Sequence, residues 1–416
     1  LSGTQLAALT TDNAKGLTYS QMAALSSAQV AALETADWAV LSSAQVQSIS
    51  VKGLQGLTTA QLAALTSTNI GQFSTLQLAS LDSAQVAAFE TADLRGWAAT
   101  QIAALGADQA AGLTAGQMAA LSSDAVAALS ASAVASLNSS QIAALTTSNI
   151  KGLSTAQLAV LSSAQVAALE TADWAAMSAA QVQAISAKGI AGLSASQIAA
   201  LTTANIGQLS TAQMAQLSTA QIAAIETADL AGLGTAQLAA LKASQVPGLS
   251  TAQIAALGTA ALSALQVLAV NGLSTSQIAA LTTANVGGLS AAQLTVIAPE
   301  LLGAMESADL NALSSAQVQS IGAKGLTGMT TTQVAALTST VLGYLSTLQV
   351  SGLSSAQVAA IETQDLAGLS ADQWGAMKAA QVAGLTNPQI AALTSQAVSS
   401  FTPGAFATLG TARIAA

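Results

Sequence analysis

An unbroken eight-residue repeat constrains this chain more than any other feature. Written in rows of eight, its 416 residues read L-S-T-A-Q-I-A-A with variations, from Leu1 to Ala416, without an insertion or deletion. Position 1 of each row is apolar, and position 6 is a large apolar residue except at Ala14 and Ala110. Every Trp and Phe falls in one of these two columns. Positions 1 and 6 are therefore the predicted core.

A short capped helix explains every column of the octad. In one continuous α-helix the apolar stripe would spiral, because eight residues advance roughly 80° beyond two turns, and a coiled coil fails for the same reason. Strands are disfavoured because Ala and Gln fill columns where β-branched residues belong. Ser or Thr at position 2 fits an N-cap, and Gln at position 5 completes a capping box. Positions 1 and 6 then form the hydrophobic staple of each helix.

Departures from the consensus obey the same scheme. Pro299 and Pro403 fall at position 3, the first helical residue, which tolerates proline. Glycines at position 8, such as Gly16, Gly56, Gly152 and Gly192, suit a helix end. Isolated helices this short are unstable in water, so neighbouring octads must stack. We therefore predict an all-α fold, an elongated solenoid of short capped helices with one helix per 8-residue repeat.

A longer period overlies the octads. Six of them, here called the acidic octads, carry the pattern E-[TS]-[AQ]-D at Glu34/Asp37, Glu90/Asp93, Glu170/Asp173, Glu226/Asp229, Glu306/Asp309 and Glu362/Asp365. Their spacings alternate between seven and ten octads, which gives a super-repeat of seventeen octads. The pairs Lys52-Gly53, Lys188-Gly189 and Lys324-Gly325 keep the same period.

This period predicts both the organisation and the pitch of the array. Residues 1–416 form one continuous array with super-repeats 1–136, 137–272 and 273–408, and residues 409–416 start a fourth. If the acidic octads all face one side of a coil, both spacings must be close to whole turns. A coil of about 3.4 repeats per turn satisfies that condition for spacings of seven and ten octads.

The acidic octads are the only candidate chemical sites. In one interpretation Glu replaces the Ser cap and Asp replaces the Gln of the capping box. In a second, the carboxylates form lateral contacts with another subunit. Calcium binding is a third interpretation but is not favoured, since calcium takes six to eight oxygen ligands and one octad supplies too few. Paired carboxylates also serve glycosidases, but six equivalent pairs do not resemble a single cleft.

The amino-acid composition argues against most kinds of enzymatic activity. The chain has no His and no Cys, so the usual proton shuttles, thiolate nucleophiles, zinc sites and haem ligands are absent. We predict no catalytic, cofactor-binding or metal-binding residues and no cofactor. A net charge of −9 argues against nucleic acid as a partner. The mean hydropathy of +0.57 raises the question of a membrane span, but the long uncharged stretches carry polar residues in most octads, so we predict none.

Strings such as Leu193-Ser-Ala-Ser-Gln-Ile-Ala-Ala and Leu249-Ser-Thr-Ala-Gln-Ile-Ala-Ala resemble the L-[ST]-T-x-Q-[IV]-A-A arrays of large secreted bacterial surface proteins. Those proteins are often labelled as haem-utilisation or adhesion proteins. A role in haem binding has no support in this chain, because it lacks the His and Cys residues that commonly ligate haem iron. The resemblance implies an extracellular location at the bacterial cell surface.

The sequence therefore predicts a non-catalytic structural protein. The leading hypothesis is a subunit that self-associates into a homopolymeric filament, fibre or sheath, because a passive spacer has no need of a super-repeat. The alternatives are the passive stalk of a large secreted adhesin and a repeat surface that binds ice or polysaccharide. The ice-binding hypothesis needs rows of exposed hydroxyls, whereas the capping scheme turns many hydroxyls toward backbone N–H groups.

Overall fold

The computed structural model describes residues 1–410, and within them the chain forms helices and no strands. Each octad up to residue 408 holds a short helix, which is an α-helix in most octads and a 3-10 helix in six of them, and the last of these octads also holds the start of η7. Every α-helix begins at position 3 of its octad. The prediction of one capped helix per repeat, with its first residue at position 3, is confirmed. Residues 411–416, most of the octad predicted to open a fourth super-repeat, lie outside the described residues.

The chain divides into two compact units, residues Leu1–Gln216 and Leu217–Ala416. The helices of the first unit are α1 Gly3–Leu6, α2 Thr11–Lys15, α3 Tyr19–Ala23, α4 Ser27–Ala32, α5 Thr35–Val40, α6 Ser43–Ser48, α7 Val51–Leu54, α8 Thr59–Ala63, α9 Ser67–Ile70, α10 Thr75–Ala79, α11 Ser83–Ala87, α12 Thr91–Leu94, α13 Ala99–Ala103, α14 Ala107–Gly112, α15 Ala115–Ala120, α16 Ser123–Ala128, α17 Ala131–Ala135, α18 Ser139–Ala143, η1 Ile150–Gly152, α19 Thr155–Ala159, α20 Ser163–Ala168, α21 Thr171–Ala176, α22 Ala179–Ala184, α23 Ala187–Ile190, α24 Ala195–Ala199, α25 Thr203–Ile206 and α26 Thr211–Met214.

The second unit continues the same pattern. Its helices are α27 Thr219–Ala223, η2 Asp229–Gly232, α28 Thr235–Ala239, η3 Val246–Gly248, α29 Thr251–Ala256, α30 Thr259–Ala264, η4 Val267–Gly272, α31 Thr275–Ile278, η5 Val286–Gly288, α32 Ala291–Val296, α33 Pro299–Ala304, α34 Ser307–Asn311, α35 Ser315–Ser320, α36 Ala323–Leu326, α37 Thr331–Ala335, α38 Ser339–Tyr344, α39 Thr347–Gly352, α40 Ser355–Ala360, η6 Thr363–Gly368, α41 Ala371–Gly375, α42 Ala379–Ala383, α43 Asn387–Ala391, α44 Ser395–Ser400, α45 Pro403–Phe406 and η7 Ala407–Leu409.

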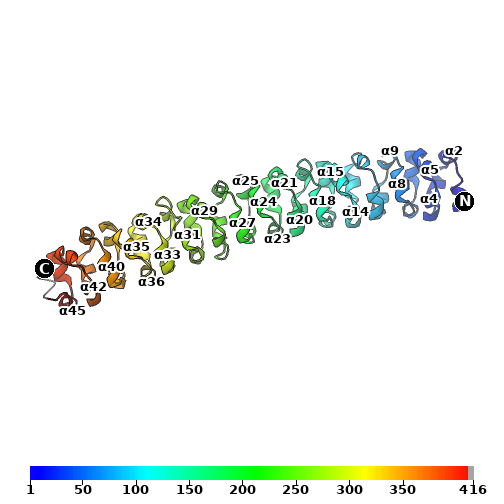
Figure 1. Ribbon diagram of the computed structural model, residues 1–416. Helices are drawn as coiled ribbons and strands as arrows, with labels where there is room; N and C mark the ends of the chain where they lie inside the picture. The colour runs from blue at the N-terminus through cyan, green and yellow to red at the C-terminus, as the bar shows by residue number, and fades with distance from the viewer. Residues whose placement is uncertain (411–416) are drawn as a thin grey trace. The chain divides into compact units, whose positions relative to one another are not determined.

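Each unit is a solenoid in which a helix packs on the helix three octads further along the chain. In the first unit α2 contacts α5 and α3 contacts α6, and in the second α37 contacts α40. Figure 1 shows the short helices following one another in successive turns within each unit. Glutamine side chains reach from one octad to the end of the helix four octads earlier and to the start of the octad three earlier. A turn therefore holds between three and four octads, in agreement with the predicted pitch.

Positions 1 and 6 form the core, as predicted. Away from the first and last turns, the apolar residues at both positions are buried in each unit. Trp38 and Trp174 at position 6 are fully enclosed. The two exceptions in that column, Ala14 and Ala110, are buried as well, so a smaller side chain still points inward there.

The polar start of the helix also follows the prediction. Ser or Thr at position 2 accepts a hydrogen bond from the N–H of position 5 in most octads, and the position 5 Gln accepts one from the N–H of position 2. Pro299 and Pro403 open α33 and α45 as first helical residues. Within residues 1–410, no helix combines the length and the hydrophobicity that crossing a bilayer requires.

Gly16 lies at a helix end as predicted, as the C-cap of α2, but several other glycines at position 8 have a different role. A glycine helix cap works through a positive φ, but within residues 1–410 the only residue with a positive φ is Gly410. A Cβ at Gly56, Gly192 or Gly328 would instead overlap the backbone of a residue in the preceding turn, such as Ser27 for Gly56. These glycines permit the close approach of successive turns. They recur once in each super-repeat, so the super-repeat period coincides with a packing requirement.

Candidate functional site

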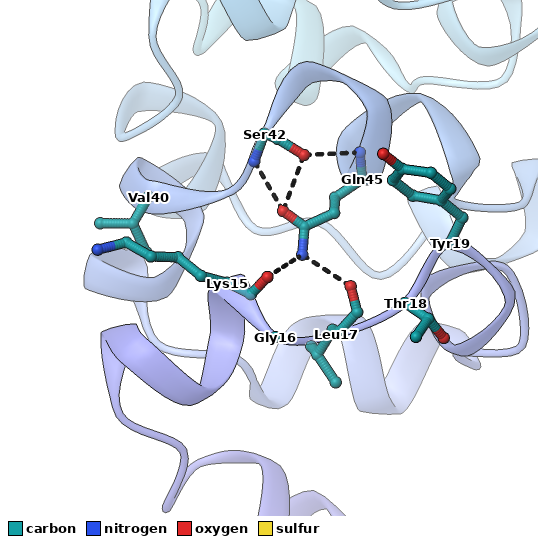
Figure 2. Close-up of a pocket in the computed structure, with 8 residues that line it drawn as sticks. All are labelled: Lys15, Gly16, Leu17, Thr18, Tyr19, Val40, Ser42 and Gln45. Carbon is teal, nitrogen blue, oxygen red and sulfur yellow. Dashed lines mark hydrogen bonds between the residues drawn. The ribbon is translucent and has the colours of Figure 1, made fainter.

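The glutamine at position 5 links successive turns of each unit. Figure 2 shows Gln45, whose side-chain oxygen accepts hydrogen bonds from the Ser42 backbone N–H at 2.8 Å and from the Ser42 hydroxyl at 2.9 Å. Its amide nitrogen donates to the carbonyl oxygens of Leu17 at 2.9 Å, Ala14 at 3.1 Å and Lys15 at 3.2 Å. The oxygen thus closes the capping box of its own helix, while the nitrogen holds carbonyl groups at the end of a helix in the turn before.

Sequence reasoning found only the first of these two roles. The capping box accepts Glu as well as Gln at this position, yet Glu never occurs at position 5 in the chain. Only the amide has N–H groups to donate to the preceding turn. The absence of Glu from this column was the signal that could have revealed the second role.

The acidic octads separate their two carboxylates. All six glutamates are exposed, whereas Asp37, Asp93, Asp173, Asp229 and Asp309 are buried and Asp365 is half-buried. In five of the six octads the glutamate is thus exposed while the aspartate is buried, and in the sixth Asp365 is still more enclosed than Glu362. The lateral-contact hypothesis remains untested, and this arrangement limits it to the glutamates.

The predicted capping role of the glutamates is wrong. Glu34, Glu90, Glu170, Glu306 and Glu362 occupy the N-cap position, but none of their side chains makes the capping hydrogen bond. The octad of Glu226 has no α-helix, and its 3-10 helix η2 begins three residues later. The carboxylate of Glu is one methylene further from the backbone than that of Asp, and short side chains are the ones that reach the N–H at this position.

The aspartates keep part of the glutamine's role. The backbone N–H groups of Glu34 and Glu170 favour the charged form of Asp37 and Asp173, so part of the glutamine's interaction with its own N-cap residue remains in these two octads. Their second carboxylate oxygen, Oδ2, is buried and has no hydrogen-bond partner, and the same holds for Oδ2 of Asp309.

Two other aspartates do have partners in the turn before. Asp93 Oδ1 accepts a hydrogen bond from the Ser67 hydroxyl at 2.6 Å. Asp365 Oδ1 accepts one from the Ser339 backbone N–H at 2.8 Å. In both cases the donor lies in the turn before, at position 3 of its octad, so a residue at that position can bond to the carboxylate of an acidic octad.

Burial changes the ionisation of the aspartates whose Oδ2 has no partner. Loss of solvation raises the pKa of Asp37, Asp173 and Asp309 above the ordinary value of 3.8. The adjacent negative charges of Glu34, Glu170 and Glu306 raise these pKa values further, and the backbone N–H groups of Glu34 and Glu170 oppose the increase at Asp37 and Asp173.

The remaining charged groups do not gather into a second site. Lys52, Lys188 and Lys324 of the Lys-Gly pairs are exposed. The one ion pair within residues 1–410 joins Lys15 and Asp12 at 3.5 Å on the surface. No cluster of three or more His, Cys, Asp or Glu that could hold a metal ion occurs in the described part of the chain.

The comparisons with known proteins agree with this repeat architecture. The family model described as the ALTTAQ repeat matches the chain nine times, at residues 30–67, 86–123, 116–147, 143–169, 166–203, 222–259, 254–291, 302–339 and 358–395. No curated protein matches the chain. The nine segments together cover more than half of the sequence, and they lie in both units. This chain, a repeat-based structural protein by its fold, therefore belongs to the ALTTAQ repeat family.

Proposed function

We propose that this chain is a non-catalytic structural element of the bacterial cell surface, which self-associates into an extracellular filament, fibre or sheath. The observation that carries the proposal is the use of the polar side chains. The hydroxyls at position 2 and the amides at position 5 form hydrogen bonds that cap the helices and join successive turns, as at Ser42 and Gln45. A repeat whose polar groups are committed to its own scaffold suits mechanical work better than recognition of a small molecule.

The surface glutamates are the proposed contacts between copies. In the first unit Glu34, Glu90 and Glu170 are exposed and recur at spacings of seven and ten octads. Hydrogen bonds of the position 5 glutamines join residues 28 apart in successive turns, so a spacing of seven octads corresponds to two turns. On the same measure the spacing of ten octads between Glu90 and Glu170 is slightly less than three turns. The three glutamates then return to roughly the same side of the coil, which gives another copy a regular set of contacts.

Electron microscopy of the purified chain, dilute and concentrated, with and without calcium, tests this function. Filaments or sheets with a lateral period that matches the super-repeat of seventeen octads would support self-assembly. Separate particles at every concentration would contradict it and favour the passive stalk of an adhesin.

A charge-matched pair of variants tests the role of the glutamates. Replacing Glu34, Glu90 and Glu170 by Gln removes three surface charges from the acidic octads. Replacing Asp12, Asp108 and Asp124 by Asn removes three charges from exposed residues at position 4 of the same unit. Assembly that is lost in the first variant and kept in the second assigns the contact to the glutamates. Equal loss in both variants would show an effect of net charge alone.

A further inference from the structure

The buried aspartates interrupt the hydrogen bonds between turns. The pattern set by glutamine predicts that the residue at position 5 donates to carbonyl groups 28 and 31 residues earlier. At Asp173 these are the carbonyls of Leu145 and Ile142, and at Asp309 those of Leu281 and Ile278. Neither the Leu145 nor the Leu281 carbonyl accepts a hydrogen bond within residues 1–410. In the register set by glutamine, the carbonyl that the position 5 side chain would bond therefore has no donor, and the Asp side chain at that position has a buried oxygen without a donor.

The asparagines of the chain show that a side chain of this length reaches those carbonyls. Asn149, also at position 5, donates from Nδ2 to Met118 at 3.0 Å and to Leu121 at 3.1 Å. Asn285 donates from Nδ2 to Ile254 and to Leu257, both at 3.0 Å. Asp and Asn have the same shape, but an ionised carboxylate only accepts hydrogen bonds. An Asp in this place can bond to the preceding turn only when it carries a proton.

Few charged groups surround these aspartates. The octads that precede and follow Asp309 by one turn, residues 273–288 and 329–336, contain none. Around Asp173 the corresponding residues 137–152 and 193–200 contain only Lys151, which is exposed on η1. On their own octads the charged neighbours are Glu306 and Glu170, and both are exposed.

The surroundings of Asp37 are similar. The preceding turn, residues 1–16, carries three charged groups. These are the α-amino group of Leu1 and the exposed side chains of Asp12 and Lys15, which form an ion pair with each other. The following turn, residues 57–64, carries no charge, and Glu34 on its own octad is exposed. Among residues 1–410, no buried cation therefore lies beside any of the three carboxylates to neutralise it.

We propose that Asp37, Asp173 and Asp309 act as proton-operated clasps between successive turns. In acid, each carboxyl group takes one proton from water, and its O–H donates to a backbone carbonyl of the preceding turn, as the Asn and Gln amides do. At neutral pH the proton returns to water, the carboxylate and the carbonyl repel each other, and the turn opens more readily. Each step is a simple proton transfer: one O–H bond forms on the carboxyl group as one O–H bond of hydronium breaks, and at neutral pH the reverse occurs. Oδ2 is enclosed, so a proton fits where a hydrated cation does not.

The direction of the pH dependence follows from the raised pKa values. Because the folded chain holds these protons more tightly than the unfolded chain, the stabilisation is complete below the ordinary pKa of 3.8. It is lost as the pH rises through the higher folded pKa. For each pKa unit of difference, the equilibrium constant for opening changes about tenfold between the two pH limits.

The test compares the full chain with the triple variant Asp37→Asn, Asp173→Asn, Asp309→Asn in urea unfolding at about pH 7 and about pH 4.5. The control variant replaces the exposed Asp12, Asp108 and Asp124 by Asn. We expect the natural chain and the control to unfold at higher urea in acid. The clasp variant should be more resistant than the natural chain at neutral pH and nearly independent of pH. A natural chain without pH dependence, or a clasp variant weaker at neutral pH, would overturn the proposal.

Infrared spectroscopy of the natural chain supplies a second readout that needs no variant to fold. Protonated carboxyl groups give their own carbonyl band, and its growth during acid titration should begin at higher pH than for exposed aspartates. A single titration in the ordinary range would contradict the clasp. Stabilisation at neutral pH by calcium chloride, with no response to acid, would assign these carboxylates to cation binding and also overturn it.

Discussion

Two octads of the first unit, around Gln117 and Asp173, have the same helical frame and different connections to the turn before. Gln117 accepts a hydrogen bond from the Thr114 N–H at 2.7 Å and donates to the carbonyls of Phe89 at 2.8 Å and Val86 at 3.0 Å. The backbone N–H of Glu170 favours the charged form of Asp173, but Oδ2 of Asp173 has no partner. The comparison teaches that the apolar columns are enough to place the helix, whereas position 5 decides how firmly one turn is held to the next.

Introducing a carboxylate into the octad of Gln117 should have the largest effect on the free energy of unfolding. Gln117→Glu keeps the oxygen that accepts from Thr114 and replaces the donating amide by a buried carboxylate oxygen that faces two carbonyls. We expect a loss of about 3 kcal/mol at neutral pH, which shrinks in acid when the carboxyl group is protonated. Urea unfolding at both pH values measures it. An unchanged unfolding curve would show that the amide does not hold the turns together.

The side chain at position 5 reaches the preceding turn only when the two turns lie close together. Substitution of a glycine between the turns should increase their separation. Gly328→Ala places a Cβ against the backbone of Pro299, whereas at Gly352, also at position 8, a Cβ meets nothing within 4 Å. The first substitution should cost about 2 kcal/mol, and Gly352→Ala should be neutral or slightly stabilising. Thermal unfolding of the two variants side by side decides the matter. Equal effects would contradict the packing role of Gly328.

Removing the hydrogen-bond donor of Asp93 should leave it, like Asp173, with a carboxylate oxygen that has no partner. Ser67→Ala deletes the hydroxyl that donates to Asp93 Oδ1 at 2.6 Å and should cost about 1.5–2 kcal/mol, since the acceptor is a buried carboxylate. Thr147 occupies the equivalent position before Asp173 and makes no such bond within the described residues, so Thr147→Ala is the matched control. Hydrogen exchange around each aspartate reports the local loss. Equal protection in both variants would mean that Ser67 contributes nothing.

The smallest effect is expected at the exposed glutamates. Glu170→Ser introduces a side chain short enough to accept from the N–H of position 5, and it should stabilise the chain by about 0.5–1 kcal/mol. Glu170→Gln should change stability by less than about 0.5 kcal/mol. Calorimetric melting of the two variants separates a cap from a mere loss of charge. A large loss of stability in either variant would reveal a structural role for Glu170 that its exposure does not suggest.

Much of the fold could be predicted because each octad is locally complete. The Ser or Thr cap, the position 5 partner and the apolar pair at positions 1 and 6 all act within a single octad, so their spacing fixed the start of each helix. The repeated spacing of the acidic octads added the pitch, since a coil must return its marked positions to one side. The candidate site was only half predictable, because the Glu and Asp of each acidic octad lie three residues apart and nothing local says that one faces water and the other the preceding turn.

The sequence by itself determined the unit and its order: a capped helix per octad, an apolar core in two columns, and a family of similar turns. Only the tertiary structure decided which groups make contact between successive turns. It assigned the Gln amide to carbonyls 28 to 31 residues away and glycines such as Gly56 and Gly328 to close contact between turns. It also left three aspartates buried with an oxygen that has no partner. The reason is physical: these contacts depend on the distance between successive turns, which no single octad contains.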